Sequence, residues 1–107
     1  KGERSMAVRK LAPETDQKRV ARMLKALGNP IRFGIVEFLA HRKTCITADI
    51  VEATPLAQST VSQHLKVLRE AGLIRGEIEG PATCYCLDRE NFRWLRDQID
   101  RWLSACC

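Results

Sequence analysis

The sequence predicts a mainly α-helical domain that also contains one two-stranded hairpin, and three observations lead to this expectation. Apolar residues recur with helical spacing over 14–40 and again over 58–71. A proline-containing turn at 54–55 divides the segment 47–73 into a short and a long apolar-faced stretch. After Leu73 the period changes from helical to alternating. Together these features are typical of a helix-turn-helix domain that continues into a two-stranded β-hairpin, and the fold class predicted below is a winged helix-turn-helix.

Two helices are predicted before the helix-turn-helix. The first covers 14–27, because acidic residues suit its start and Gly28 breaks it. Its expected apolar face consists of Val20, Met23, Leu24 and Leu27. The second begins at Asn29-Pro30, since asparagine is a good N-cap and proline suits the first helical position, and it ends near Ala40. Its expected core residues are Ile31, Ile35, Phe38 and Leu39.

The segment 47–73 is the part around which the rest is organised. Thr54 and Pro55 mark its turn, because the residue before a proline is pushed out of helical geometry. Beyond the turn, one face of the predicted helix carries Val61, Leu65 and Leu68. Gly72 is expected to stop this helix at the position just past its last turn.

The opposite face of the same helix is polar. Hydroxyls and amides can hydrogen-bond base edges and phosphate oxygens, and lysine and arginine neutralise phosphate charge. A second helix of this kind is the one that enters the major groove in helix-turn-helix proteins. The residues expected in or beside the groove are Gln58, Ser59, Thr60, Ser62, Gln63 and His64, with Lys66 and Arg69 toward phosphates. The alternative is a helical hairpin whose polar face is simply solvated.

The remaining elements are predicted from a change in the hydrophobic period and from a residue that suits a helix N-cap. Two alternating runs within 74–87 flank Gly80-Pro81 and predict an antiparallel hairpin. Asp88 is expected to cap a last helix over 88–104. Its apolar stripe contains Phe92, Leu95, Ile99 and Trp102 or Leu103. Trp94 falls off this stripe, so the helix is expected to need a second surface to bury.

The string STVSQHLKVLREAGLI, residues 59–74, resembles the recognition helix of the ArsR-type (ArsR/SmtB) winged-helix transcriptional repressors. The resemblance extends over 16–103. It implies a homodimer that binds operator DNA and that a metal or metalloid ion often releases from it. It further implies that the hairpin is a wing reaching DNA, and that the first and last helices form the dimer interface.

Length and charge agree with this expectation. A chain of 107 residues predicts one domain, 1–107, and residues 1–5, KGERS, are interpreted as a remnant before the initiator Met6. The net charge of +5 favours a polyanionic partner, although ordinary solubility also explains it. The motifs of serine hydrolases, zinc proteases and phosphate-binding loops are missing, so an enzyme is not expected.

The cysteines predict a reducing compartment. Five is an odd number, which argues against a fully paired disulfide framework and favours the cytoplasm, where thiols stay reduced. No apolar run approaches the roughly 18 residues that span a bilayer, and no signal peptide is visible.

Both ion sites that the resemblance would imply lack their ligands. The thiolate sensor of the family is a C-x-C-D-L run, and the matching residues 46–50 read ITADI. The carboxylate and histidine site of the last helix needs a histidine after His64, and none follows. The hypothesis that remains is a site for As(III), Sb(III) or another thiophilic ion at Cys106 and Cys107.

Such a site needs a third thiolate, which Cys45, Cys84 or Cys86 would supply. Cys84 and Cys86 should share one face of the hairpin, where they could equally serve as small apolar residues. Two other interpretations stay open. One is a redox-responsive or ligand-independent regulator of the same fold, and the other is a thiol-metal binding module that never contacts DNA.

Two residue choices depart from the family pattern. Ala57 stands where these proteins often carry a serine that caps the recognition helix. The wing tip carries Glu77 and Glu79, where arginine or lysine is commoner. The recognition helix is therefore expected to contribute more of the binding than the wing.

Overall fold

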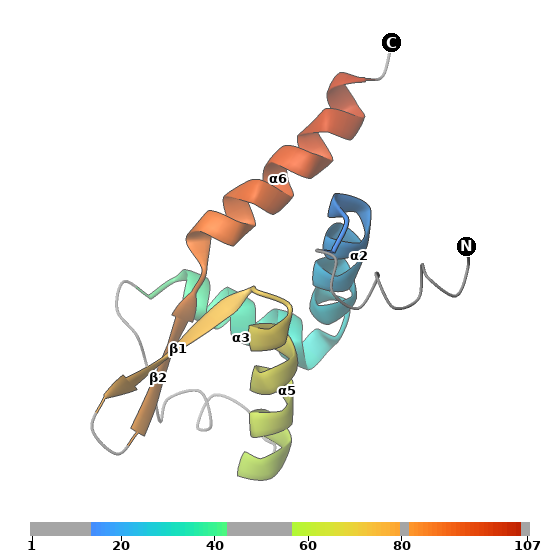
Figure 1. The fold of residues 1–107 in the computed structure, drawn as a ribbon. Coiled ribbons are helices and arrows are strands. Elements are labelled where there is room, and N and C mark those ends of the chain that lie inside the picture. The colour runs from blue at the N-terminus through green and yellow to red at the C-terminus, as the bar shows by residue number, and fades with distance from the viewer. Residues whose placement is uncertain (1–13, 43–56, 80–81, 106–107) are drawn as a thin grey trace, which may run out of the picture.

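The computed structural model describes residues 14–42, 57–79 and 82–105. Its elements in chain order are α2 (Asp16–Leu27), α3 (Pro30–Ala40), α5 (Gln58–Glu70), β1 (Ile74–Glu79), β2 (Ala82–Leu87) and α6 (Arg89–Ser104) (Figure 1). This mainly helical fold with one antiparallel pair of strands confirms the predicted class. The predicted turn at 54–55 and the first helix of the helix-turn-helix lie outside the described residues. No helix among the described residues is both long enough and apolar enough to cross a membrane.

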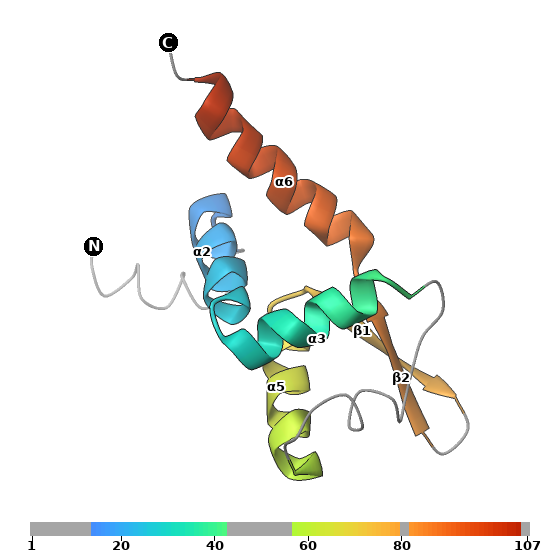
Figure 2. The same cartoon turned by 180° about the vertical axis from the view of Figure 1, so that it is seen from behind.

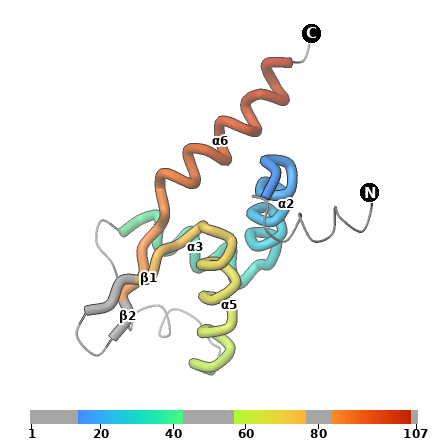
Figure 3. The backbone as a smooth tube through the Cα atoms, in the orientation of Figure 1, coloured from blue at the N-terminus to red at the C-terminus, as the bar shows by residue number. Residues whose placement is uncertain are grey.

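The three helices α2, α3 and α5 pack together, and the hairpin packs beside α3 and α5 (Figures 1 and 2). The backbone trace of Figure 3 shows α6 leaving directly from the end of β2 and passing α2. The core between these elements is formed by buried apolar side chains from every helix and both strands. They are Val20, Met23, Ala26, Ile35, Val36, Leu39, Val61, Leu65, Leu68, Ala71, Leu73, Ile74, Leu87 and Leu95.

Helix α2 begins two residues later than predicted and buries a slightly different face. Thr15 is its N-cap, because the Thr15 hydroxyl accepts a hydrogen bond from the Lys18 backbone N–H at 3.3 Å. Leu24 was expected in the core but is 39% exposed, whereas Ala26 is buried. Helix α2 packs against both α3 and α5, and the close approach favours the small Ala26 side chain over the larger Leu24.

Helix α3 starts as predicted. The Asn29 side-chain oxygen accepts hydrogen bonds from the backbone N–H groups of Ile31 and Arg32 at 2.9 and 3.1 Å, and Pro30 occupies the first turn. Ile35 and Leu39 are buried as expected. Val36, which was not expected, is also buried, while Ile31 and Phe38 pack at the edge of the core.

Helix α5 buries the stripe that its spacing predicts, Val61, Leu65 and Leu68. Its end is a Schellman motif: the Leu73 N–H donates to the Leu68 carbonyl and the Gly72 N–H to the Arg69 carbonyl, both at 3.0 Å. Gly72 has φ +80°, a conformation that favours glycine, which confirms it as the stop of this helix.

The strands pair in the register Ile74↔Leu87, Arg75↔Cys86 and Glu77↔Cys84. Because residues two apart on a strand share a face, Cys84 and Cys86 lie on the same side of the hairpin, as predicted. Ile74 and Leu87 pair at the base of the hairpin and are both buried in the core. The predicted Gly80-Pro81 turn lies outside the described residues.

Helix α6 is capped by Asp88, whose carboxylate accepts the Asn91 backbone N–H at 3.1 Å, as predicted. Trp94 finds its second surface within the same chain, because the Arg19 guanidinium of α2 lies 3.8 Å from the ring centroid. The exposed apolar side chains of α6 are instead those at its end. Trp102 is 59% and Leu103 71% exposed, on the part of α6 that projects beyond the other elements (Figure 2).

The start of α5 provides a direct test of local energetics. Ala57 is the N-cap, is exposed, and has no side chain that could accept from the first-turn N–H groups. An Ala57→Ser substitution should supply that acceptor and raise the free energy of unfolding by about 1 kcal/mol. Urea denaturation of both proteins measures the change.

The matched control is Ala21→Ser, an exposed alanine within α2. There a serine provides no cap and should lower stability by a few tenths of a kcal/mol, roughly 0.5, through its poorer helix propensity. Equal effects at the two positions would contradict the assignment of the helix start.

Candidate nucleic-acid interface

The outward face of α5 carries the side chains that the sequence predicts for DNA contact. Burial of the apolar stripe turns the other side of the helix toward solvent. The exposed residues of this recognition face are Gln58, Ser59, Thr60, Ser62, Gln63, Lys66 and Arg69. They run from hydroxyls and amides in the first turns to cations in the last turns. A helix with this layout can present short hydrogen-bonding groups to bases and its cations to phosphates.

His64, the remaining predicted contact, has a different environment. It is half-buried, and its Nδ1 lies 3.4 Å from Nη1 of Arg32 on α3. The Arg32 Nε donates at 2.7 Å to the carbonyl of Ala26, which fixes the guanidinium beside α5. Sequence reasoning treated α3 as a core element and missed Arg32. A cation in the first turn of an amphipathic helix gives no local sign of which neighbour it will contact.

The beginning of α5 is electrostatically suited to anions. Its first turn contains no acidic residue, so the positive end of the helix dipole is not neutralised by its own side chains. Figure 1 shows this first turn at the same end of the molecule as the tip of the wing. A duplex lying along that end could meet both elements. The register places the backbone of Glu77 and Glu79 on β1 near this tip.

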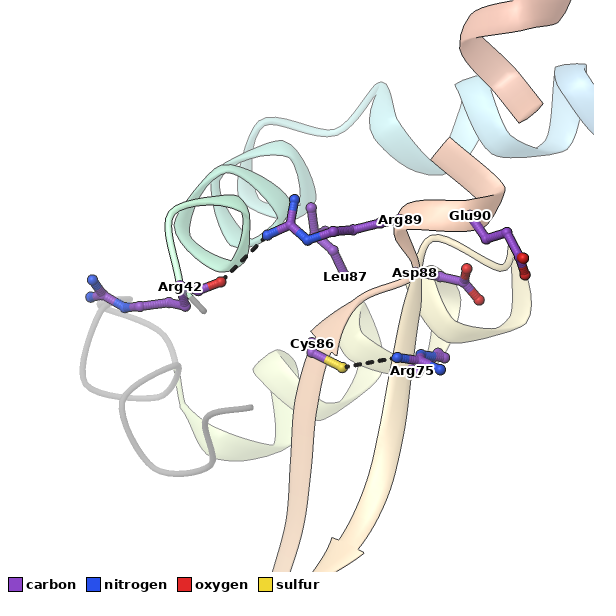
Figure 4. Close-up of a pocket in the computed structure, with 7 residues that line it drawn as sticks. All are labelled: Arg42, Arg75, Cys86, Leu87, Asp88, Arg89 and Glu90. Carbon is purple, nitrogen blue, oxygen red and sulfur yellow. Dashed lines mark hydrogen bonds between the residues drawn. The ribbon is translucent and has the colours of Figure 1, made fainter. Parts of the chain in front are cut away.

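A cavity of about 410 Å³ lies at the opposite end of the hairpin, between the end of α3 and the start of α6. Its lining residues are Arg42, Arg75, Cys86, Leu87, Asp88, Arg89 and Glu90 (Figure 4). The arginines do not converge there. Arg42 stacks on the Phe38 ring at 4.2 Å, and Arg89 donates to the Ala40 and Arg42 carbonyls at 3.3 and 3.4 Å. These contacts join α3 to α6.

The two described cysteines differ in accessibility. Cys84 is buried, with 2% of its surface exposed, whereas Cys86 is half-buried and faces the cavity. The Cys86 sulfur accepts a hydrogen bond from the Arg75 guanidinium at 3.9 Å, visible in Figure 4. Within the described ranges, no group of three or more histidine, cysteine, aspartate or glutamate side chains could hold a metal ion. Cys45, Cys106 and Cys107 lie outside these ranges, so the three-thiolate site stays a prediction.

The fold and this face of α5 define a winged helix-turn-helix protein. Residues 29–75 match the family model described as "Bacterial regulatory protein, arsR family". The arsenical resistance operon repressor of Bacillus subtilis is 36% identical over 84 residues, which are 78% of this chain and 74% of that repressor. The regulator MJ1325 of Methanocaldococcus jannaschii is 31% identical over 77% of this chain and 92% of its own. The chain therefore belongs to the ArsR family.

The transcriptional repressor SmtB of Mycobacterium tuberculosis is 40% identical over 65 residues, 61% of this chain. Those residues span only 47% of that repressor, so the similarity covers about half of its length. Among solved structures, a possible transcriptional regulator for arsenical resistance superimposes with a TM-score of 0.65 at 31% identity, over 75% of this chain and 82% of its own. An ArsR-like regulator from Rhodococcus, at 18% identity and TM-score 0.73, covers 83% of both chains and shares the fold.

Proposed function

We propose that this chain is a DNA-binding transcriptional repressor that reads its operator through the outward face of α5. The observation that carries the proposal is the division of α5 into a buried apolar stripe and an exposed face that is polar except for Val67. A solvated surface helix would have no need for neutral hydroxyls and amides gathered in its first turns with cations behind them. The net charge of +5 favours the same polyanionic partner, and relatives at 31 to 40% identity are named repressors.

Within this function the two kinds of side chain have different roles. Ser62 and Gln63 present donors and acceptors that can distinguish base edges in the major groove. Lys66 and Arg69 neutralise phosphate charge, which raises affinity for every sequence alike. The acidic wing adds little attraction, so α5 supplies most of the contact.

The first test removes the base-reading groups. Ser62→Ala with Gln63→Ala should eliminate the preference for the cognate operator over random duplex, because alanine offers base edges no hydrogen-bonding group. Loss of two hydrogen-bonding contacts to bases, each worth about 1–3 kcal/mol, should weaken binding to the cognate operator by roughly 30-fold or more. Fluorescence anisotropy with an operator selected from a random duplex pool measures both affinities, and circular dichroism checks the fold.

The matched variant is Lys66→Ala on the same helix. It should weaken cognate and random duplex about equally and reduce the salt dependence of binding, because it removes a phosphate contact. Cognate preference that survives the double alanine change would show that another surface reads the sequence.

We further infer that the repressor is a homodimer formed through α2 and α6. One recognition helix reads one half-site, and two-fold symmetry matches a palindromic operator. Leu24 on α2 and Trp102 and Leu103 on α6 are large apolar side chains left exposed by the single chain. A winged helix-turn-helix fragment from Mycobacterium bovis with 28% identity and a TM-score of 0.62 is described as homodimeric, which supports the same assembly here.

Sedimentation equilibrium at micromolar concentration tests the dimer. Wild type should sediment as a dimer, and Leu103→Asp should raise the dimer dissociation constant by roughly 30-fold or more, the effect of losing an interface side chain worth about 2 kcal/mol. The control is Phe33→Ser on α3, which removes another large, exposed apolar side chain outside the inferred interface and should leave the dimer intact. A monomeric wild type would contradict the inference.

The proposed inducer is As(III), Sb(III) or another thiophilic ion bound by Cys106 and Cys107 with a third cysteine. Soft thiolates select such ions. Of the candidates for the third ligand, Cys86 is partly accessible and Cys84 is buried, so Cys86 could be reached with less rearrangement. An ion at the end of α6 would lie at the inferred dimer interface. It could thereby change the angle between the two recognition helices and so release DNA. The arsenical resistance repressors among the relatives support this choice of ion.

Arsenite titration of the reduced protein on operator DNA tests the inducer site. Changing Cys106 and Cys107 together to serine should raise the arsenite concentration needed for release by at least about tenfold, because even outer-shell partners of a metal site contribute 10–100-fold to affinity. The Cys84→Ser variant is the control and should respond like wild type. Release that is undiminished in the double variant would exclude the terminal cysteines from induction.

A further inference from the structure

Side chains from both α2 and α6 converge on the end of the recognition helix. The Asn91 side chain of α6 donates from Nδ2 to the Gly72 carbonyl at 2.8 Å. Its oxygen accepts from Nη2 of Arg19 on α2 at 3.0 Å. Asp88 accepts the backbone N–H of Asn91, which fixes the start of α6 beside this contact. One amide therefore joins three elements that are far apart in the sequence.

Both partners of Asn91 are themselves held in place. The Arg19 guanidinium is stacked on the ring of Trp94, so α6 orients it from two sides. Gly72 has φ +80°, and a Cβ there would lie only 3.0 Å from Asn91 Nδ2. The close approach of the amide to the backbone thus depends on the same glycine that ends α5. An aspartate at 91 would place an oxygen against the Gly72 carbonyl, and an alanine would leave Arg19 and Gly72 without this partner.

A second arginine of α2 forms a hydrogen bond with the same end of α5. Arg22 Nη1 donates to the carbonyl of Glu70, the last residue of the helix. Its other nitrogens, Nε and Nη2, donate to the Glu14 carboxylate at 2.9 and 2.8 Å. These hydrogen bonds lower the pKa of Glu14, which keeps the partner charged. Arg19 and Arg22 are one helical turn apart, so a single face of α2 provides both of these arginine side chains.

We propose that Asn91, Arg19 and Arg22 are positioning residues that set the angle of the recognition helix to α2 and α6, and thereby the half-site spacing that the dimer accepts. The inference rests on the proposed DNA-binding function and on α2 and α6 forming the interface. In that arrangement the three side chains are the polar connection from the interface of each protomer to its recognition helix.

The geometry makes the spacing sensitive to this connection. Helix α5 has 13 residues, which corresponds to a length of about 20 Å. The hydrogen bonds from Asn91 and Arg22 hold its C-terminal end, whereas its N-terminal turns contact the bases in the major groove in helix-turn-helix proteins. A tilt of about 10° about this held end would move the reading end by about 3.4 Å, which is close to the roughly 3.4 Å of helix axis that one base pair occupies.

The test measures spacing preference. Wild type, Asn91→Ala and Arg19→Ala are each titrated with four kinds of duplex. One carries two selected half-sites at the preferred spacing, two others have that spacing lengthened or shortened by one base pair, and the last carries a single half-site. Wild type should prefer one spacing by about tenfold or more over its neighbours, since a shifted half-site forfeits contacts worth at least 1–3 kcal/mol. In both variants that preference should fall to within about threefold, while single half-site affinity stays within about twofold of wild type, because α5 keeps its reading face.

Glu37→Gln is the control, since Glu37 is exposed on α3, outside the inferred interface, and the variant should keep the wild-type preference. Urea unfolding accompanies each protein, and Arg19→Ala, at a half-exposed position, decides the outcome if Asn91→Ala does not fold. A merely structural role would lower binding to all spacings by the same factor, and this result would overturn the proposal, as would an unchanged preference. A wild-type chain that binds none of the duplexes would overturn the proposed function and this inference with it.

Discussion

Burial of the apolar stripe of α5 is the interaction on which the rest of the structure depends. Leu68 and Val61 are almost completely buried, together with Met23 of α2 and Leu39 of α3. Each such side chain contributes roughly 1.5–3 kcal/mol when removed from water. Successive residues of a helix are about 100° apart, so a shift of one residue would bury hydroxyls and amides and expose the leucines. The packing therefore fixes which side of α5 faces outward, and the recognition face exists only because the opposite face is buried.

The sequence predicts well those features that neighbouring residues determine. Asn29 and Asp88 accept backbone N–H groups two or three residues away, and Gly72 provides the conformation that ends α5. The alternation of the hairpin likewise needs only the residues of its two strands. In each case the signal and the structure lie within one or two turns of chain, so the outcome depends little on the rest of the molecule.

Features that depend on tertiary packing could not be predicted in this way. Leu24 is more hydrophobic than Ala26 and was expected inside, but the close contact of α2 with its neighbours favours the smaller side chain. Trp94 is covered by Arg19, which lies 75 positions earlier in the chain. The pair Asn91 and Arg19 is separated by 72 positions. No periodicity indicates such pairs, because each polar residue alone is compatible with a solvated surface.

The arginine contacts show that part of the positive charge of the chain serves the fold. Arg22, Arg32 and Arg89 each donate to backbone carbonyls at the ends of helices, which are α5, α2 and α3 respectively. The last carbonyls of a helix lack partners within it and carry its partial negative charge, so these guanidiniums satisfy acceptors that would otherwise need water. Their positive charge therefore stabilises the C-terminal ends of these helices. Lys66 and Arg69, in contrast, are exposed on α5, the helix whose outward face also carries hydroxyl and amide side chains. The combination of these cations with hydroxyls and amides on one helix face, more than the total charge of +5, is what favours α5 as the proposed DNA-binding surface.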